Sequence, residues 1–236
     1  KKGFSVALKI NFIFLLFVIP LFAFLLFFSY RVSYVGIFTE RKEIIKAEIT
    51  SACQYYLTLK NSSIINSPEN AKKIFFEYVN NYSYSEFGYF YVYSMQGILL
   101  SHRYLKDKIG TSLWNFKDVK GNLLIQEHVR LLNTNPDGVF LEFWFKKSAN
   151  DPDEYPKISY TRKLDDDIFI GTDLYYDDIQ KDAFMDTLKF GIIMIIIIVI
   201  INLFLRFIVR KSLKPIGKMR EIMEEVAKGD LTVKLD

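Results

Sequence analysis

The chain has 236 residues, 50% of them hydrophobic and 25% charged, which fits neither a disordered chain nor an ordinary soluble domain. The net charge is +4, yet residues 31–189 carry 20 basic and 22 acidic side chains, so the positive excess lies at the two ends. A nucleic-acid-binding domain would concentrate positive charge on its folded part, so we predict no nucleic-acid partner. The single Cys53 excludes an intramolecular disulfide. One Cys and two His argue against a structural zinc site, so we expect no metal and no cofactor.

Two apolar segments are long enough to cross a bilayer. Residues 10–30 and residues 190–209 each contain about 20 residues, the length of a membrane-spanning helix. A cleaved signal peptide is the alternative for the first segment, but the apolar run is too long and no small-residue cleavage site follows it. Basic residues flank the outer end of each segment, which places both chain ends in the cytoplasm. We therefore expect a cytoplasmic segment 1–9, a span 10–30, an extracytoplasmic domain 31–187, a span 188–209 and a second cytoplasmic segment 210–236.

The extracytoplasmic part is predicted to be an α+β domain. An apolar stripe at helical spacing, running from Val35 to Leu59, indicates a helix over residues 32–60, with Cys53 beside it as a small core residue. Ser67-Pro68-Glu69 marks the start of a second helix ending near Tyr82. Alternating residues then predict a hairpin from strands 87–93 and 98–103. A short helix over residues 122–132, with His128 on its surface, is followed by strands 139–146, 156–163 and 168–172. This order predicts a long N-terminal helix and a five-stranded antiparallel sheet with helices on one face.

Four segments carry a resemblance to a known family. The chain reads GYFYVYSMQGILLSH, IGTSLWNFKDVKGNLLIQE, VFLEFWFKK and YPKISYTRKLDDDIFIGTDLYYDDI in the order of the single Cache family, the PAS-like extracellular sensor domains of bacterial chemoreceptors and sensor kinases. The resemblance covers about residues 87–179. The chain departs from the family at the acidic turn Asp165–Asp167, where an aromatic residue is frequent, and at Arg103, where Pro commonly follows His. Both changes would alter the rim of a pocket.

The C-terminal tail resembles a HAMP linker. Its apolar residues follow a heptad spacing and form a seam of Leu213, Ile216, Met219, Met223 and Val226. Pro215 near the start and Gly229-Asp230-Leu231 at the end match the first helix and the closing motif of that family. A heptad seam indicates a parallel coiled coil, so we expect a homodimer. Because the sequence begins with Lys and stops within this motif, we expect it to be a fragment of a longer receptor.

The family resemblance implies a small carboxylate ligand such as acetate, propionate, lactate or pyruvate. Such a ligand needs a cation or several N–H and O–H donors in a mostly apolar hollow. The candidate ligand-binding residues are Tyr91, Tyr93, His102, Trp114, Lys157, Tyr160 and Arg162. Each has a structural alternative: the tyrosines as ordinary sheet residues, His102 as a satisfied core residue, and Trp114 as a core plug. Lys157 and Arg162 have opposite strand parity, so only one of them can face the pocket.

Together these patterns predict a transmembrane receptor of the cell inner membrane, with the sensor domain on the periplasmic or extracellular side. A methyl-accepting chemotaxis receptor is the first expectation, and a sensor histidine kinase or a cyclic-dinucleotide enzyme is the alternative. Its partners would be a small organic acid, the membrane, a second copy and cytoplasmic signalling proteins. A tethered external enzyme is disfavoured because the sequence has no nucleophile–base–acid set, metal cluster or phosphate loop, so no catalytic residue is expected. A structural anchor is disfavoured because it would not need a HAMP relay.

Overall fold

The computed structural model describes residues 6–65, 67–84, 88–147 and 151–227, and the chain divides into two compact units. One unit contains Lys1–Ser33 and Phe184–Asp236, and the other contains Tyr34–Ala183. The predicted Gly229-Asp230-Leu231 motif and the predicted start of the first strand at Phe87 lie outside the described residues. We describe the two units separately.

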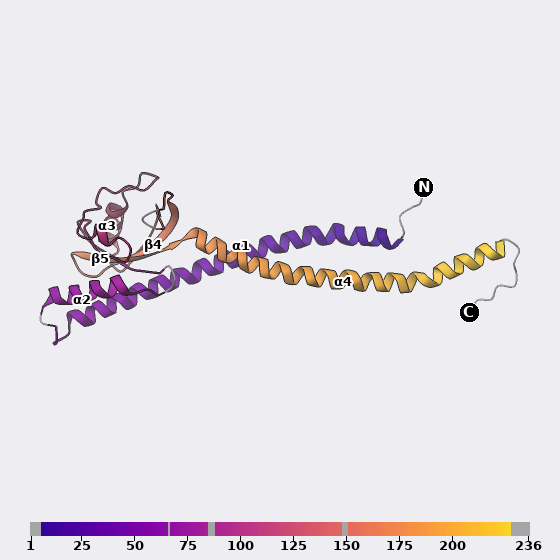
Figure 1. Cartoon of the computed structure of the whole chain (residues 1–236), viewed down its shortest axis with the longest axis horizontal. Coiled ribbons are helices and arrows are strands. Elements are labelled where there is room, and N and C mark those ends of the chain that lie inside the picture. Colours follow the sequence, from indigo (N-terminus) through magenta and orange to yellow (C-terminus); the bar gives the residue numbers. More distant parts are fainter. Residues whose placement is uncertain (1–5, 66, 85–87, 148–150, 228–236) are drawn as a thin grey trace. The chain divides into compact units, whose positions relative to one another are not determined.

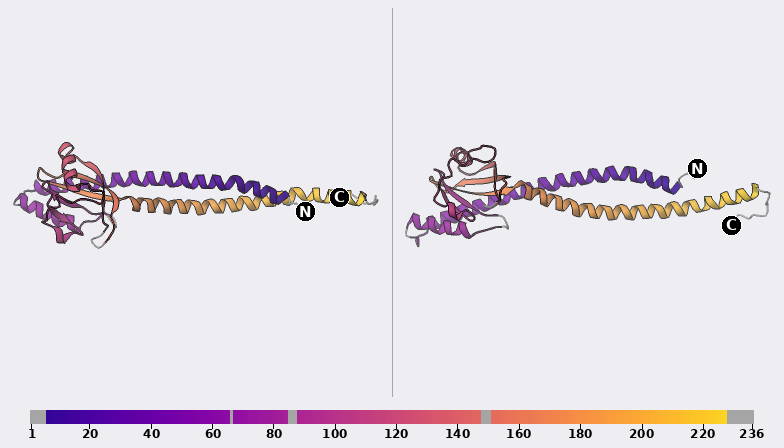
Figure 2. Two further views of the ribbon diagram at one scale, coloured as in Figure 1. Left: turned by 90° about the horizontal axis from the view of Figure 1, so that it is seen from above. Right: turned by 45° about the horizontal axis from the view of Figure 1, so that its top comes forward.

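The first unit is built from parts of two long helices, α1 (Val6–Lys60) and α4 (Tyr176–Ala227). Both helices contain a stretch that is long and apolar enough to cross a membrane. They run antiparallel and side by side in this unit (Figures 1 and 2). The Asn202 side-chain amide donates a hydrogen bond of 2.8 Å to Asn11, and Gly191 allows the Leu26 side chain to approach closely. The predicted HAMP seam falls within the last turns of α4, and its pairing with a second copy stays a prediction.

A five-stranded antiparallel sheet forms the centre of the second unit (Figure 1). Its strands are β1 (Tyr91–Ser94), β2 (Leu99–His102), β3 (Val139–Phe145), β4 (Tyr155–Lys163) and β5 (Ile168–Tyr175). The order across the sheet is β2-β1-β5-β4-β3, so the last strand lies in the middle. This sheet and the long N-terminal helix confirm the predicted α+β fold.

One face of the sheet is covered by α1 and by α2 (Pro68–Asn81). Ser67 caps α2 as predicted, because its hydroxyl accepts a hydrogen bond of 3.2 Å from the Asn70 backbone N–H. The predicted stripe of α1 is buried over its second half, and Cys53 is buried as predicted; the stripe residues that form the core are Ile45, Ile49, Ala52 and Tyr56. Val35, which belongs to the same predicted stripe, is 53% exposed, so the packed part of the stripe begins later in the helix.

The opposite face is covered by α3 (Leu124–Thr134), which Figure 1 labels, and by side chains of the segment that contains the short 3-10 helix η1 (Lys106–Lys108) and leads to α3. Helices therefore lie on both faces of the sheet, whereas the sequence pattern predicted them on one face. The α3 helix begins two residues later than predicted. His128, predicted to lie on the surface, is 1% exposed, because α3 turns this side chain toward the sheet. The second core lies here, around Tyr93, Leu132, Phe143 and Phe169.

Candidate ligand-binding site

A buried ion pair between the central strands defines the most unusual site in the second unit. The Lys157 ammonium on β4 lies 2.5 Å from a carboxylate oxygen of Asp173 on β5. The side chain of Lys157 is 1% exposed and that of Asp173 is 5% exposed. A buried charge is tolerated only when it is paired and hydrogen-bonded, because removing it from water costs free energy. Lys157 and Asp173 meet this condition by pairing with each other. Such an arrangement in a cavity marks a candidate binding site.

Aromatic rings surround the Lys157 ammonium. Its nitrogen lies 5.2 Å from the ring centre of Phe143, 5.0 Å from Phe145 and 4.7 Å from Tyr175. It also donates a long hydrogen bond of 3.4 Å to the Tyr175 hydroxyl. Burial lowers the pKa of Lys157, and the Asp173 carboxylate opposes this shift. The rings favour a cation at this position and exclude water from it.

Tyrosine side chains form a second wall of the site. The Tyr91 hydroxyl donates a hydrogen bond of 3.1 Å to Asp173. The ring of Tyr91 lies directly over the backbone of Gly171, where an added Cβ would be 2.4 Å from the ring. A glycine is therefore required at position 171 for Tyr91 to reach Asp173. Burial raises the pKa of Tyr91 well above its ordinary value, so the hydroxyl stays protonated and can act as a donor.

His102, at the end of β2, is a neutral residue of the same wall. Its Nδ1 accepts hydrogen bonds of 3.1 Å from the backbone N–H groups of Tyr104 and Leu105. Burial lowers the pKa of His102 to about 3, and the nearby Lys157 charge acts in the same direction. With Nδ1 engaged as an acceptor, the proton of the neutral ring resides on Nε2. His102 is thus held as a hydrogen-bond donor rather than a cation.

His128 supports the site from α3. Its Nδ1 lies 2.9 Å from the Leu124 carbonyl and its Nε2 lies 2.9 Å from the Ser159 hydroxyl. Because a carbonyl can only accept, Nδ1 carries a proton. The Ser159 contact joins α3 to β4, and the burial of the ring corrects the prediction that His128 is a surface residue.

Two adjoining cavities lie on this side of the sheet. The inner cavity has a volume of about 30 Å³ and contains Lys157 and Asp173, together with Tyr91, Tyr93, His102 and His128. The outer cavity has a volume of about 210 Å³, and its apolar lining includes Leu105, Leu113 and Phe116. Tyr89, His102 and Phe145 belong to both, so the two cavities are neighbours. We call the outer cavity the vestibule.

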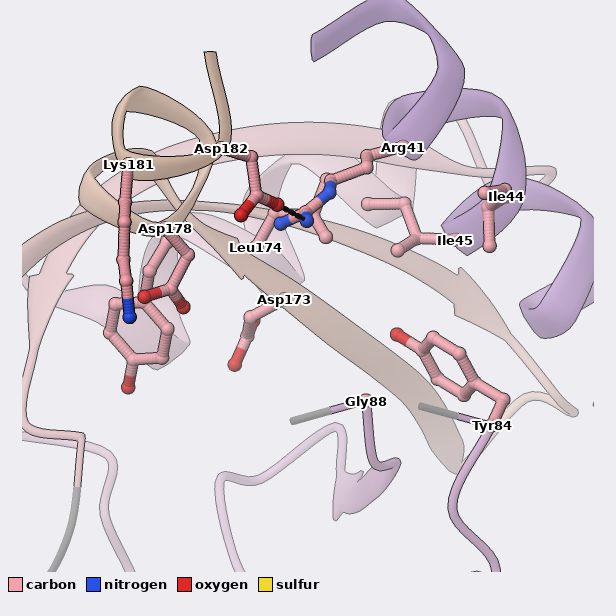
Figure 3. A pocket seen from close by; sticks show the side chains of 11 residues that line it. Arg41, Ile44, Ile45, Tyr84, Gly88, Asp173, Leu174, Asp178, Lys181 and Asp182 are labelled. Atoms are coloured by element: carbon pink, nitrogen blue, oxygen red, sulfur yellow. Dashed lines mark hydrogen bonds and ion pairs between the residues drawn. The ribbon is translucent and has the colours of Figure 1, made fainter. Parts of the chain in front are cut away.

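A third cavity approaches Asp173 from another direction (Figure 3). It has a volume of about 390 Å³ and lies between α1, β5 and the first turns of α4. Arg41 and Asp182 form an ion pair at its edge, and Asp173 projects from β5 toward it. Asp173 therefore lines both this cavity and the inner cavity that holds Lys157.

The structure brings four of the seven sequence-predicted site residues together. Tyr91, Tyr93, His102 and Lys157 line the inner cavity. Tyr160 and Arg162 instead belong to the other face of the sheet, where Tyr160 packs on Phe140 and Arg162 pairs with Asp137. Successive side chains of a strand point to opposite faces of the sheet, and Tyr160 and Arg162 lie an odd number of residues from Lys157, so they face away from it. We therefore exclude these two from the candidate site.

Trp114 also lies apart from the inner cavity. It packs against the turn at Gly97, where an added Cβ would be 3.0 Å from its ring, and it lines a groove beside α3. Sequence reasoning missed Asp173, because the predicted fifth strand ended at Thr172. The sequence did contain a sign of it. Asp173 lies four residues after Phe169, so in a continued strand the two side chains point to the same face, and Phe169 is buried on the cavity side.

No metal centre accompanies this site within the described residues: they contain no group of three or more His, Cys, Asp or Glu side chains that could hold an ion. The site therefore consists of a buried cation, its carboxylate partner and neutral O–H and N–H donors in an aromatic hollow. Such a site can bind and orient a small polar molecule.

The domain is thus a five-stranded antiparallel sheet with helices on both faces and a buried polar pocket on one of them. Residues 39–187 match the family described as Single Cache domain 2, and the chain belongs to this family. Cache domains are extracellular sensor domains, like those of chemotaxis receptors that bind small ligands.

Solved structures share the fold. One, described as "Periplasmic sensor domain of chemotaxis protein", is 22% identical, covering 58% of this chain and 96% of its own, with a TM-score of 0.53. A methyl-accepting chemotaxis protein from Vibrio parahaemolyticus is 26% identical over 64% of this chain and 98% of its own, with a TM-score of 0.55. A third, described as "Structural basis for carboxylic acid recognition by a Cache chemosensory domain", is 16% identical over 59% and 96%, with a TM-score of 0.53.

Proposed function

We propose that the chain is the sensory part of a transmembrane receptor that binds a small carboxylate at Lys157. The observation that carries the proposal is the buried Lys157 ammonium, which lies among aromatic rings at the inner end of a cavity. An ammonium has three N–H donors, and Asp173 occupies one of them at close range. A ligand carboxylate would take another, with Tyr93 and His102 as further neutral donors, since Tyr91 already donates its proton to Asp173. Charge-assisted hydrogen bonds of this kind are among the strongest available to a small ligand.

The comparisons support this ligand class. One structure with the same fold is a Cache chemosensory domain that recognises a carboxylic acid. The size of the ligand limits its affinity, because the best very small ligands gain about 1.5 kcal/mol per heavy atom. A four-atom ligand such as acetate would then bind in the range of tens of micromolar, roughly −6 kcal/mol. Lactate and pyruvate, with six heavy atoms each, could bind more tightly.

The route of the signal starts at β5. Asp173 belongs to the strand that passes directly into α4, so a ligand that changes the Lys157–Asp173 pair acts on the strand that precedes this helix. We propose that α4 crosses the membrane of the cell and continues as a HAMP helix in a homodimer. A chemotaxis receptor is the favoured output, supported by the 26% identity to a methyl-accepting chemotaxis protein. A sensor histidine kinase or a cyclic-dinucleotide enzyme is the alternative output.

Ligand binding is tested with the full chain in lipid nanodiscs by isothermal titration calorimetry with acetate, propionate, lactate and pyruvate. The K157Q/D173N double variant removes both charges and leaves no unpaired ion, so it should fold but lose at least tenfold in affinity. R162Q is the matched control, because Arg162 lies on the same strand and faces the other way. Equal carboxylate affinity in the double variant and the wild type would refute the site.

The membrane arrangement is tested separately. Reporter fusions at Trp114 and at Met219 should report opposite sides of the membrane, because the two positions are separated by the second apolar stretch. Reporters on the same side would contradict the proposed transmembrane arrangement. A tethered enzyme or an anchor would then need to be considered.

A further inference from the structure

The vestibule carries a second cation that is fixed in position. Lys147, which follows β3, lines the vestibule and is 31% exposed. Its ammonium lies 2.6 Å from Asp177 and 2.7 Å from Asp178, both in the first turn of α4. Lys147 therefore connects the vestibule to the first turn of α4 through two ion pairs.

Their shared contact with Tyr175 sets an upper limit on the separation of the two lysine ammonium groups. The Lys157 nitrogen lies 4.7 Å from the ring centre of Tyr175, and the Lys147 nitrogen lies 5.1 Å from the same centre. The two nitrogens are therefore less than 10 Å apart. An extended four-carbon dicarboxylate has about 4 Å between its carboxyl carbons, and each carboxylate oxygen approaches an ammonium to about 2.8 Å. It therefore spans about 10 Å between two ammonium groups, which corresponds to the upper limit of the separation between Lys157 and Lys147.

The cavity volumes favour a ligand that extends outward. The inner cavity, at about 30 Å³, has room for little more than one carboxylate group, so the body of any larger ligand must lie in the vestibule. The vestibule contributes three lysines and two acids, and one of the acids, Glu154, already accepts a hydrogen bond from the Val119 backbone N–H. Lysines therefore outnumber acids among the residues that line the vestibule, and Lys147 is the one of them that pairs with Asp177 and Asp178; the lysines are Lys108, Lys146 and Lys147.

From these observations we infer that the vestibule contains a subsite for a second anionic group, at Lys147, and that the preferred ligand is a short dicarboxylate. This inference rests on the proposed carboxylate site at Lys157. The outer carboxylate competes with Asp177 and Asp178 for the Lys147 ammonium. A monocarboxylate held at Lys157 has no group that reaches Lys147 and leaves this contact intact.

Release of the acids from Lys147 is feasible because of their position. Asp177 and Asp178 lie in the first turn of α4, where the exposed N–H groups and the helix dipole favour negative charge without a lysine. One oxygen of Asp177 is buried and has no hydrogen-bond partner among the described residues, so the present arrangement does not satisfy this carboxylate fully. The contact between Lys147 and α4 is thus one that a competing anion can replace.

The experiment compares succinate, a four-carbon dicarboxylate, with propionate by calorimetry on the full chain in nanodiscs. Wild type should bind succinate at least tenfold more tightly than propionate. K147Q should lose this preference, with roughly tenfold weaker succinate binding and unchanged propionate binding. R162Q is the matched control, because it also removes one positive charge, and Arg162 lies on the opposite face of the sheet, away from the vestibule. It should leave both affinities unchanged.

A second variant tests the competition itself. D177N/D178N removes the acids that compete for Lys147, so succinate affinity should rise several-fold, whereas propionate affinity should not change. Hydrogen exchange in residues 176–183 should also become faster with succinate and not with propionate. Equal weakening of both ligands by K147Q, no weakening of succinate binding, or tighter binding of propionate by wild type would overturn the inference. If K157Q/D173N still abolishes binding in that case, the proposed function stands and only the second subsite fails.

Discussion

Replacing Lys157 by Met tests whether the buried ion pair is as costly to break as its burial indicates. The methionine fills a similar volume, but it leaves the Asp173 carboxylate, with its side chain 5% exposed, without its cation. The Tyr91 hydroxyl remains as a partner. Removing one partner of a buried pair costs about 3–5 kcal/mol, because the other charge stays desolvated. For a domain of this size, that loss lowers the unfolding midpoint by about 6–20 °C.

The double variant K157M/D173N separates this effect from a simple loss of packing. An asparagine at position 173 can still accept the hydrogen bond from Tyr91 and carries no charge, so the double variant should lie within about 1–2 kcal/mol of wild type. Thermal and urea unfolding of the full chain in detergent, followed by near-UV circular dichroism, measures both variants. A K157M variant as stable as wild type, or a double variant as unstable as K157M, would refute the reasoning.

Three further predictions concern the same cavity. G171A should cost about 1–3 kcal/mol in the same unfolding assay and weaken carboxylate binding, because the added methyl group displaces the Tyr91 ring from Asp173. His102 should lower stability by about 2 kcal/mol between pH 7.5 and pH 5, since burial lowers its pKa to about 3 and the unfolded chain binds a proton that the folded chain excludes. H102N should reduce this slope. H128L should cost about 2–3 kcal/mol, because it removes the two buried hydrogen bonds of the His128 ring, one to Ser159 and one to the Leu124 carbonyl; an equally stable variant would refute the role of His128.

Local patterns in the sequence predicted most of the fold. The Ser67-Pro68-Glu69 cap predicted the start of α2, and the alternation of residues 89–93 placed Tyr91 and Tyr93 opposite Phe90 and Val92. These features depend only on neighbours in the chain, so the sequence contains them directly. The placement of helices on both faces of the sheet depends on long-range packing, and the sequence pattern did not predict it.

The candidate site was predicted in part for the same reason. Strand parity showed that Lys157 and Arg162 face opposite ways, but only the assembled sheet shows that Lys157 faces the cavity. Asp173 was missed because it matters as the ion-pair partner of Lys157, and the two residues meet only when β4 and β5 pair. His128 was assigned to the surface because a histidine on a polar short helix usually is exposed. Its burial depends on Ser159, again a partner on another strand.

The junction between β5 and α4 contains no spacer, because the strand ends at Tyr175 and the helix begins at Tyr176. One residue inserted there would turn everything downstream by about 100° and advance it by about 1.5 Å. Seven residues would nearly restore the original rotational phase, since they complete about two helical turns. Any output transmitted through α4 should therefore vary periodically with insertion length, with maxima where the added residues complete whole turns.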